Sequence, residues 1–425
     1  MYKILISGYY GFNNIGDESI LMAVTGGLKD KLGVYGKDIE ITVLSHDPEN
    51  TSAKYQVKAK NRKSIFSIAM AVLQCDLLIS GGGSLLQDVT SKKSILYYLF
   101  IMLLARLFGK DYFIYSQGIG PINSKFNKSI TSKVLKKAAA IIVRDEASKE
   151  FLSEIGVDGD KVVVTADPVL RVKRAELSIG QEILRAEGCT FFNTEIKTEI
   201  SDCSNMDICE SESSQIYQRQ AEVISDGVDD CLLQETLAEG RCIVGFAIKE
   251  RKLHSSFITE LLEAIEILIK ERNCNVVLIP FHFNEDMAAI EYLEKCLKDR
   301  DCGQYVCAIK HKYLTNEMMS IIGNTDVLVG VRLHSLIHAA IMGVPMIGIS
   351  YDPKVNSFMH SMGLKAMSSI YDFKSEYFLE EFDKTIYNRR QIVEKVSGKV
   401  EELKAKLDTN EEMIKALMNK RLKKE

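Results

Sequence analysis

The sequence predicts an α/β protein in which two Rossmann-like domains face each other across a cleft, followed by C-terminal helices. Two observations support this fold class. Short β-branched runs alternate with longer helical patterns in two successive series, and glycines or charged residues follow several of the predicted strands. The chain of 425 residues is long enough for two or three domains with their own hydrophobic cores.

The first series covers residues 1–172, which we expect to form the N-terminal, acceptor-side domain with its glycine-rich loops. Its predicted strands are 3–7, 40–44, 76–80, 112–117, 141–144 and 162–165. Its predicted helices are 19–31, 64–74, 94–108, 125–138 and 146–155. Strands that alternate with helices indicate βαβ units and a mainly parallel sheet.

The second series covers residues 242–372, which we expect to form the donor-side Rossmann-like domain. Its predicted strands are 242–248, 275–279, 305–308, 325–331 and 346–350. Its predicted helices are 256–271, 286–298, 316–323 and 335–342. Parallel strands again indicate an edge of strand ends and loops at which a ligand would bind.

Two regions fall outside these series. Residues 173–241 are acidic and hold four of the ten cysteines, so we expect an inserted linker or small subdomain, with a regulatory or partner-binding lobe as the alternative. Residues 373–425 form a charged helical tail, which we expect to pack back over the domain interface. Its apolar stripe consists of Val393, Val396, Val400, Leu403 and Leu407.

Composition excludes several classes of protein. A formal charge of −4 argues against a nucleic-acid binder. No Cys-x-x-Cys pair or Cys/His zinc spacing is present, so we expect no metal site, and without an export signal we expect reduced thiols and a cytoplasmic location. The apolar run 95–105 is too short to span a bilayer and is interpreted as a buried helix, with a membrane-touching helix as the alternative. The basic end, 420–424, gives a second, weaker indication of peripheral contact with the inner face of the membrane.

The most informative segment is 327–340, where an apolar strand pattern ends in Arg332, Leu333 and His334 before a helix begins. Arg332 offers a planar, permanently charged fork for a carboxylate or phosphate, and His334 can carry a proton near neutral pH. The alternative is a buried Arg–His pair that serves structure only. Either way, both side chains are expected at the ligand-binding edge of the second sheet.

Three glycine-rich turns follow strands of the first domain, at 8–18, 81–88 and 116–121. They supply candidate cleft residues for the acceptor: Asn14, Gly16, Gly82, Gly83, Gln117 and Gly118. Glycines let the backbone approach a ligand, but the spacing is not the Gly-x-Gly-x-x-Gly dinucleotide fingerprint. Asp17 is a candidate base toward a sugar hydroxyl, or alternatively a helix cap.

Other strand ends supply further polar residues. Arg144 ends the predicted strand 141–144 and could bind an anion together with Arg332, unless it only pairs with Asp145. His282 and Tyr351 are candidate cleft residues, and Lys354 is a candidate third cation. We therefore expect a small anionic ligand to be held between the two domains.

Taken together, these motifs resemble those of the polysaccharide pyruvyl transferase family, especially its cell-wall branch called CsaB. The motifs are Gly-Tyr-Tyr-Gly-Phe-Asn-Asn-Ile-Gly-Asp-Glu at 8–18, Gly-Gly-Gly-Ser-Leu-Leu-Gln-Asp at 81–88, Ser-Gln-Gly-Ile-Gly-Pro at 116–121, Val-Arg-Asp at 143–145, Val-Arg-Leu-His-Ser at 331–335 and Tyr-Asp-Pro-Lys-Val at 351–355. The resemblance covers the chain except for the acidic insertion and the tail. Relatives often carry an arginine where this chain has Ala247-Ile248-Lys249.

The resemblance implies a fold like that of the GT-B glycosyltransferases and phosphoenolpyruvate as co-substrate, with no cofactor. It assigns donor binding to Arg144, Arg332, Leu333 and His334, with His334 as the general acid that protonates the donor. The implied product is a pyruvate ketal on a saccharide, in the CsaB branch a lipid-linked disaccharide containing N-acetylmannosamine that anchors surface-layer proteins. We then expect Asp17 to be the base toward the acceptor.

Two other functions compete with this interpretation. A GT-B glycosyltransferase that uses a nucleotide sugar would have the same two-domain cleft, and a non-catalytic sugar-binding module is the third possibility. The acceptor, the ketal positions and the oligomeric state are left open by the sequence.

Overall fold

The computed structural model describes residues 1–32, 39–89, 91, 93–192, 240–249 and 255–422. The first domain is built on a seven-stranded sheet with the order β3-β2-β1-β4-β5-β6-β7, in which all neighbours run parallel. Its strands are β1 (Tyr2–Tyr10), β2 (Ile39–Ser45), β3 (Lys58–Asn61), β4 (Leu77–Gly81), β5 (Asp111–Gln117), β6 (Ala140–Val143) and β7 (Val162–Val164). All carboxyl ends therefore meet at one edge, as the sequence predicts.

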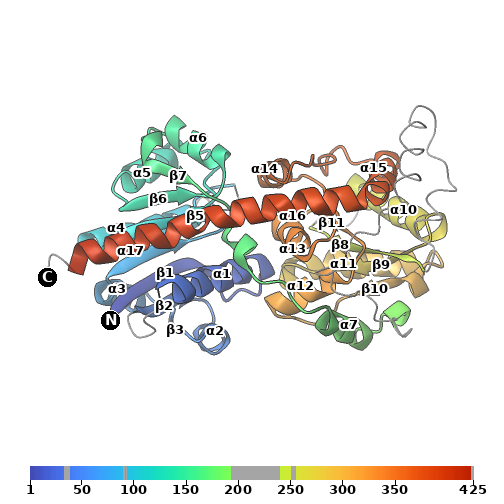
Figure 1. The fold of residues 1–425 in the computed structure, drawn as a ribbon, viewed down its shortest axis with the longest axis horizontal. Helices are drawn as coiled ribbons and strands as arrows, with labels where there is room; N and C mark the ends of the chain where they lie inside the picture. The colour runs from blue at the N-terminus through green and yellow to red at the C-terminus, as the bar shows by residue number, and fades with distance from the viewer. Residues whose placement is uncertain (33–38, 90, 92, 193–239, 250–254, 423–425) are drawn as a thin grey trace, which may run out of the picture.

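Helices cover both faces of this sheet (Figure 1). They are α1 (Ile15–Leu32), α2 (Pro48–Tyr55), α3 (Ile65–Gln74), α4 (Ser94–Leu107), α5 (Lys125–Leu135) and α6 (Glu146–Glu154), with the 3-10 turns η2 (Gly159–Lys161) and η3 (Pro168–Arg171). Several begin at side-chain caps: Ser64, Ser124 and Asp145 accept the backbone N–H three residues on.

The second domain has a five-stranded parallel sheet with the order β10-β9-β8-β11-β12. Its strands are β8 (Cys242–Ala247), β9 (Cys274–Leu278), β10 (Val306–Ala308), β11 (Val327–Gly330) and β12 (Met346–Gly348). The helices around it are α7 (Leu177–Ala186), α10 (Ser256–Lys270), α11 (Phe283–Lys298), α12 (Thr315–Gly323), α13 (Leu333–Met342) and α14 (Pro353–Ser361), with η4 (Thr190–Phe192) and η5 (Gly303–Tyr305).

One hydrophobic core is shared by the two domains. It joins Ile20 and Val24 of α1 to Met319 of α12, Ile337 of α13 and Val396 of the C-terminal tail, all fully or almost fully buried. A backbone hydrogen bond from Ile15 N to Phe281 O (2.9 Å) also crosses between the domains beside the cleft. The two strand-end edges therefore face each other across a packed interface.

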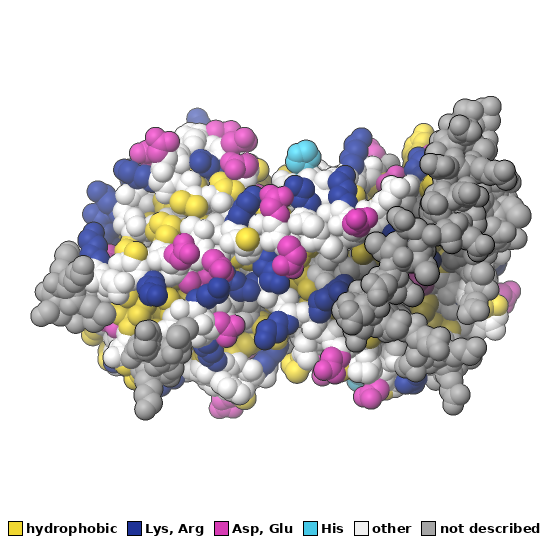
Figure 2. Space-filling view, in the orientation of Figure 1, with side chains coloured by type: hydrophobic (Ala, Val, Ile, Leu, Met, Phe, Trp, Pro, Cys, Tyr) yellow, Lys and Arg dark blue, Asp and Glu magenta, His cyan; other side chains and the backbone are white. Residues whose placement is uncertain are grey.

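The tail crosses this interface. Helix α15 (Ser375–Tyr387) packs on α10, α16 (Arg389–Lys406) packs on α13, and α17 (Asp408–Leu422) reaches α1 of the first domain (Figure 1). Glu411 of α17 accepts from Arg171 Nη1 at 2.8 Å and from the Tyr115 hydroxyl. Basic and acidic side chains are mixed over the face that these helices present (Figure 2). The C-terminal helices predicted from the sequence are thus present and fasten one domain to the other.

Two elements of the first domain are absent from the sequence prediction. Strand β3 has the sequence Lys-Ala-Lys-Asn and lies at the sheet edge, where charged side chains protect an unpaired strand and erase the apolar alternation. Helix α2 is short and depends on its cap, since Asp47 accepts from Asn50 N and Pro48 occupies the first turn. Helix α1 also begins at Ile15, four residues before the predicted start.

The region 173–241 differs from the expected insertion in its first part. Helix α7 packs against α12, so this segment belongs to the second domain, while residues 193–239 lie outside the described part of the chain.

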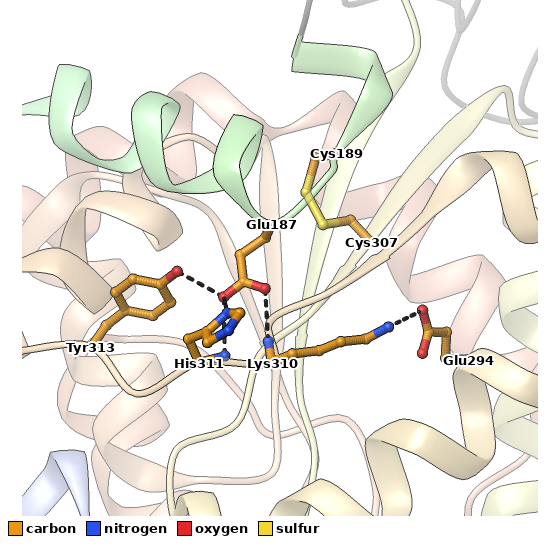
Figure 3. Close-up of a disulfide and its surroundings, with 7 residues drawn as sticks. All are labelled: Glu187, Cys189, Glu294, Cys307, Lys310, His311 and Tyr313. Carbon is orange, nitrogen blue, oxygen red and sulfur yellow. Dashed lines mark hydrogen bonds and ion pairs between the residues drawn. A yellow bond between two sulfur atoms is a disulfide. The ribbon is translucent and has the colours of Figure 1, made fainter.

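Beyond α7, Glu187 accepts hydrogen bonds from the Lys310 N–H, the His311 N–H and the Tyr313 hydroxyl (Figure 3). Next to it, Cys189 and Cys307 form a disulfide. The expectation of reduced thiols is wrong for this pair, because the fold brings cysteines 118 residues apart to a Cα–Cα distance of 5.2 Å.

The apolar run 95–105 lies inside α4, with one side buried in the core of the first domain. Among the described residues, no helix combines the length and apolar character needed to cross a membrane.

Candidate active site

A cavity of about 180 Å³ lies between the facing strand-end edges. The first domain contributes residues that follow β1, β4 and β6: Asn14, Asp17, Gly83, Ser84 and Arg144. The second domain contributes residues that follow β9, β11 and β12: Phe281, Arg332, Leu333, His334, Tyr351, Asp352, Lys354 and Val355. We call this space the small cavity. It gathers most of the residues that the sequence singles out, from segments more than 300 positions apart.

Arg144 is buried and held from two sides. Its Nη1 donates to Asp167 Oδ2 at 2.8 Å, and its Nη2 donates to Ser84 Oγ at 3.1 Å. The contact with Asp145 is longer, at 3.4 Å, and Asp145 mainly caps α6 by accepting from Ser148 N at 2.8 Å. The alternative of a simple Arg144–Asp145 pair therefore does not describe this site.

Arg332 stands at the N-terminal end of α13, where its Nη2 donates to Asp286, and Glu285 Oε2 lies 3.5 Å away. Its Nε is buried, and no described residue gives it a hydrogen-bond partner. A buried, unsatisfied donor costs free energy that an incoming anion would recover. Arg332 is therefore both oriented by carboxylates and equipped to accept a further anionic partner.

Lys354 supplies the third cation of the small cavity. Its Nζ lies 3.4 Å from Asp352 Oδ2, and burial lowers the pKa of its ammonium group. Together with Arg144 and Arg332 it brings positive charge from both domains to one small space. That arrangement suits a ligand with more than one anionic group.

His334 occupies the second position of α13, and its buried Nε2 makes no hydrogen bond within the described part of the chain. The nearest carboxylate oxygen, Asp167 Oδ2, is 3.8 Å from Nε2. Burial lowers the pKa of His334 to about 4; Asp167 opposes this shift, whereas Arg144, Lys354 and Arg332 add to it. The imidazole is therefore neutral at pH 7 when no anion is bound.

Asp17 lies in the first turn of α1, where its Oδ2 accepts from Asn14 Nδ2 at 2.6 Å. The capping role falls to Asn14, whose Oδ1 accepts from Gly16 N at 3.1 Å, so Asp17 is not the helix cap. Burial, followed by the neighbouring Glu18, raises the pKa of Asp17 to about 7. A carboxyl that titrates near neutral pH is suited to proton transfer.

Five predicted site residues do not line the small cavity. Gly16 and Gly118 make room for charged side chains, because a Cβ would come within 2.3 Å of His334 Nδ1 and 2.7 Å of Arg144 Nε, respectively. Gly82 packs against Ile20 and Pro168, and Gln117 is buried and accepts from Ser80 Oγ at 3.3 Å. His282 pairs its backbone with Asn14 across the domain interface. These residues shape the site without lining the small cavity. A position at a strand end does not by itself tell a residue that lines the cavity from one that supports it.

Asp167 is the main residue that the sequence analysis missed. It follows β7 and lies between Arg144 of its own domain and His334 of the other. Arg144 was selected because it stands at the end of a predicted strand. The same criterion would have selected Asp167, which stands three residues beyond the end of β7. Lys249, at the position where relatives often carry an arginine, donates to the Tyr351 hydroxyl beside the small cavity.

A second cavity, of about 300 Å³, adjoins the small one and shares Arg144, Leu333 and Lys354 with it. Its walls come from α6, η3, α13, α14 and α16, with apolar side chains such as Leu170, Phe358 and Leu403. Polar and charged groups, among them Asp145, His360 and Lys406, line it as well. We call this space the adjoining cavity. It has room for a larger, partly apolar ligand next to the cations.

Most of the chain matches a known protein family. The family model for polysaccharide pyruvyl transferase matches residues 14–353. The amylovoran biosynthesis protein AmsJ of Erwinia amylovora is 20% identical over 446 residues, which cover 94% of this chain and 96% of AmsJ.

Solved structures with similar folds are glycosyltransferases and sugar-nucleotide enzymes. A glycosyltransferase from Rickettsia africae superposes with a TM-score of 0.60 at 12% identity, covering 98% of each chain. HepE of Anabaena, in complex with UDP and glucose, gives 0.58 at 10% identity, covering 99% of this chain and 100% of HepE. UDP-GlcNAc 2-epimerase of Neisseria meningitidis gives 0.56 at 13% identity, covering 98% and 100%. These likenesses confirm the predicted GT-B-like arrangement of two Rossmann-like domains.

Proposed function

Because the chain belongs to the polysaccharide pyruvyl transferase family, we propose that it transfers a pyruvyl group from phosphoenolpyruvate to a saccharide, forms a pyruvate ketal and releases phosphate. One observation carries the proposal: Arg144, Arg332 and Lys354 converge from two domains on the cavity that also holds His334 and Asp17. Phosphoenolpyruvate brings a carboxylate and a phosphate on a small three-carbon frame, which matches three cations in a space of this size.

Proton transfer is the first chemical step. The imidazolium of His334 gives a proton to the methylene carbon of the donor, and an acceptor hydroxyl adds to the adjacent carbon as its own proton passes to Asp17. Phosphate then leaves with the proton held by Asp17. The second hydroxyl closes the ketal on the same carbon, and its proton returns to His334. Protons are thereby balanced over the two additions.

The pKa values of His334 and Asp17 set a condition on this mechanism. His334 is neutral and Asp17 partly protonated near pH 7, the reverse of the reactive pair. A bound anionic donor places negative charge beside the imidazole and raises its pKa. The donor therefore has to bind before His334 can act as the acid.

We propose the adjoining cavity as the place for the acceptor sugar, since it opens beside Arg144 and Lys354 and has apolar walls against which a sugar ring can pack. The AmsJ likeness supports a polysaccharide precursor as acceptor. Our finer proposal, from the CsaB resemblance, is a lipid-linked disaccharide containing N-acetylmannosamine. It places the enzyme in the cytoplasm in contact with the membrane.

Mass spectrometry tests this function. Lipid-linked and synthetic acceptors are incubated with phosphoenolpyruvate, and a pyruvyl mass gain with release of phosphate is expected. His334→Ala should abolish ketal formation and retain measurable donor binding. Sugar transfer from a nucleotide sugar, with no phosphate released from phosphoenolpyruvate, would overturn the proposal in favour of a glycosyltransferase. Acceptor binding without turnover in the parent would indicate a sugar-binding module.

A further inference from the structure

Helix α3 has two apolar stripes rather than one. Ile68, Ala71 and Val72 are buried in the core of the first domain. On the opposite side, Phe66 is 77% exposed, and Met70 and Leu73, four and seven residues later, are exposed as well. A helix at the surface of a soluble protein normally turns a polar side outward, so the second stripe needs an explanation.

Helix α4 repeats the pattern. Its inner side holds Tyr98, Ile101 and Met102 in the same core. Its outer side exposes Phe100, Leu103 and Leu107, spaced by three and four residues, with Leu107 76% exposed. The outward apolar surface therefore extends over two helices.

Helices α3 and α4 are in contact, and α5 packs on α4, so the three form one surface at the end of the molecule away from the second sheet (Figure 1). Phe126 at the start of α5 is exposed too. We call the outward sides of α3, α4 and α5 the apolar face. Single exposed apolar residues are common, but a continuous set on neighbouring helices indicates a binding surface.

The three helices that form the apolar face carry charge of one sign. None of the three helices contains an aspartate or glutamate. Exposed cations lie on them or within two residues before them, at Lys63, Lys93, Arg106 and Lys125. The contrast with α16 and α17, where both signs are mixed (Figure 2), shows that this is not the general character of the surface.

We propose that the apolar face docks the enzyme on a membrane surface that contains anionic lipids. Exposed aromatic and aliphatic side chains would enter the boundary between headgroups and acyl chains, and the surrounding cations would meet the lipid phosphates. A second copy of the chain is a poorer occupant, because it would place two cationic faces against each other. The inference rests on the proposed function in one respect: a lipid-linked acceptor is the reason for the enzyme to work at a membrane.

Vesicle co-sedimentation of the full-length protein tests the proposal. Wild type should bind vesicles of phosphatidylcholine with phosphatidylglycerol, bind pure phosphatidylcholine more weakly, and bind less as salt rises. Phe66→Ser with Leu107→Ser should lower the partition constant at least about tenfold, since two large apolar contacts are lost. Lys63→Glu with Lys93→Glu should lower binding to the anionic vesicles by about fivefold or more for each charge.

Matched controls lie on the second domain. Tyr371 is 80% exposed and Lys365 is exposed, so Tyr371→Ser and Lys365→Glu repeat the changes away from the apolar face and should leave binding unaltered. Because vesicle binding is measured without donor or acceptor, it does not depend on pyruvyl transfer. Activity on a soluble acceptor should be the same in all four variants.

Equal binding by wild type and the Phe66→Ser, Leu107→Ser variant would overturn the proposal, as would loss of binding in the controls. A dimer in size-exclusion chromatography that this variant converts to monomer, without vesicle binding by the parent, would assign the face to a second copy instead.

Discussion

Replacing Asp17 with asparagine should stabilise the protein, by an amount that depends on pH. The carboxyl is buried, and its pKa is raised from 3.8 to about 7. The folded state thus holds its proton more tightly than the unfolded chain does. The stability due to the protonated form is fully present below about pH 4 and is lost as pH rises through about 7.

The size of the effect follows from the two pKa values. Ionisation of this carboxyl in the folded protein costs about 4 kcal/mol relative to the unfolded chain. Asparagine has no charge to bury, and its amide oxygen can still accept from Asn14 Nδ2. The free energy of unfolding of Asp17→Asn should therefore match that of wild type near pH 4 and exceed it by up to about 4 kcal/mol at pH 8.

Urea denaturation of both proteins at half-unit steps from pH 4 to pH 8 measures this difference. Asp30→Asn, at an exposed carboxyl on the same helix, is the control for the loss of one charge. A flat difference for Asp17→Asn, or a destabilisation that grows with pH, would refute the argument that burial governs this carboxyl. The same variant should lose about 10²-fold to 10⁴-fold in turnover if Asp17 is the base.

Three further substitutions probe the site. Arg332→Lys should lower kcat/KM for phosphoenolpyruvate by about tenfold or more, because an ammonium group cannot reproduce the two parallel N–H donors of the guanidinium. Unchanged donor affinity in a binding titration would contradict a role of Arg332 in donor binding. Asp167→Asn should cost about 3–5 kcal/mol in urea denaturation, because it leaves the charge of Arg144 buried without the carboxylate that lies 2.8 Å away. A variant as stable as wild type would show that the ion pair contributes little. Gly16→Ala should displace the His334 ring and lower kcat with little change in global stability. The control Gly26→Ala lies on the same helix, where no described atom is within 4 Å of the added Cβ, and it should be neutral or stabilising. Equal activity in the two variants would exclude a close contact between residue 16 and His334.

Local patterns predicted most of the fold because parallel strands are buried on both faces and leave a strong apolar signal. Strand β1 is a clear example, with its long buried run. Helix α10 is equally clear, because its buried residues recur at helical spacing. The polar edge strand β3 left no such signal, and α7 was hidden in an acidic stretch although it packs tightly on α12. The assignment of α7 depends on its contact with α12, where Ser320 accepts from Gly180 N, 140 positions away in the sequence. No local sequence pattern reports such a contact.

For the site, the sequence determined which side chains stand at strand ends, and Arg144, Arg332, His334 and Asp17 were all found in that way. Their charge states were decided by the tertiary structure, because burial and neighbouring charges set the pKa of His334 and Asp17. Asp167 also stands after a strand end, but only the tertiary structure shows that it lies between Arg144 and His334. Residue types are fixed by the sequence, whereas distances and dielectric surroundings exist only once the two domains close on each other.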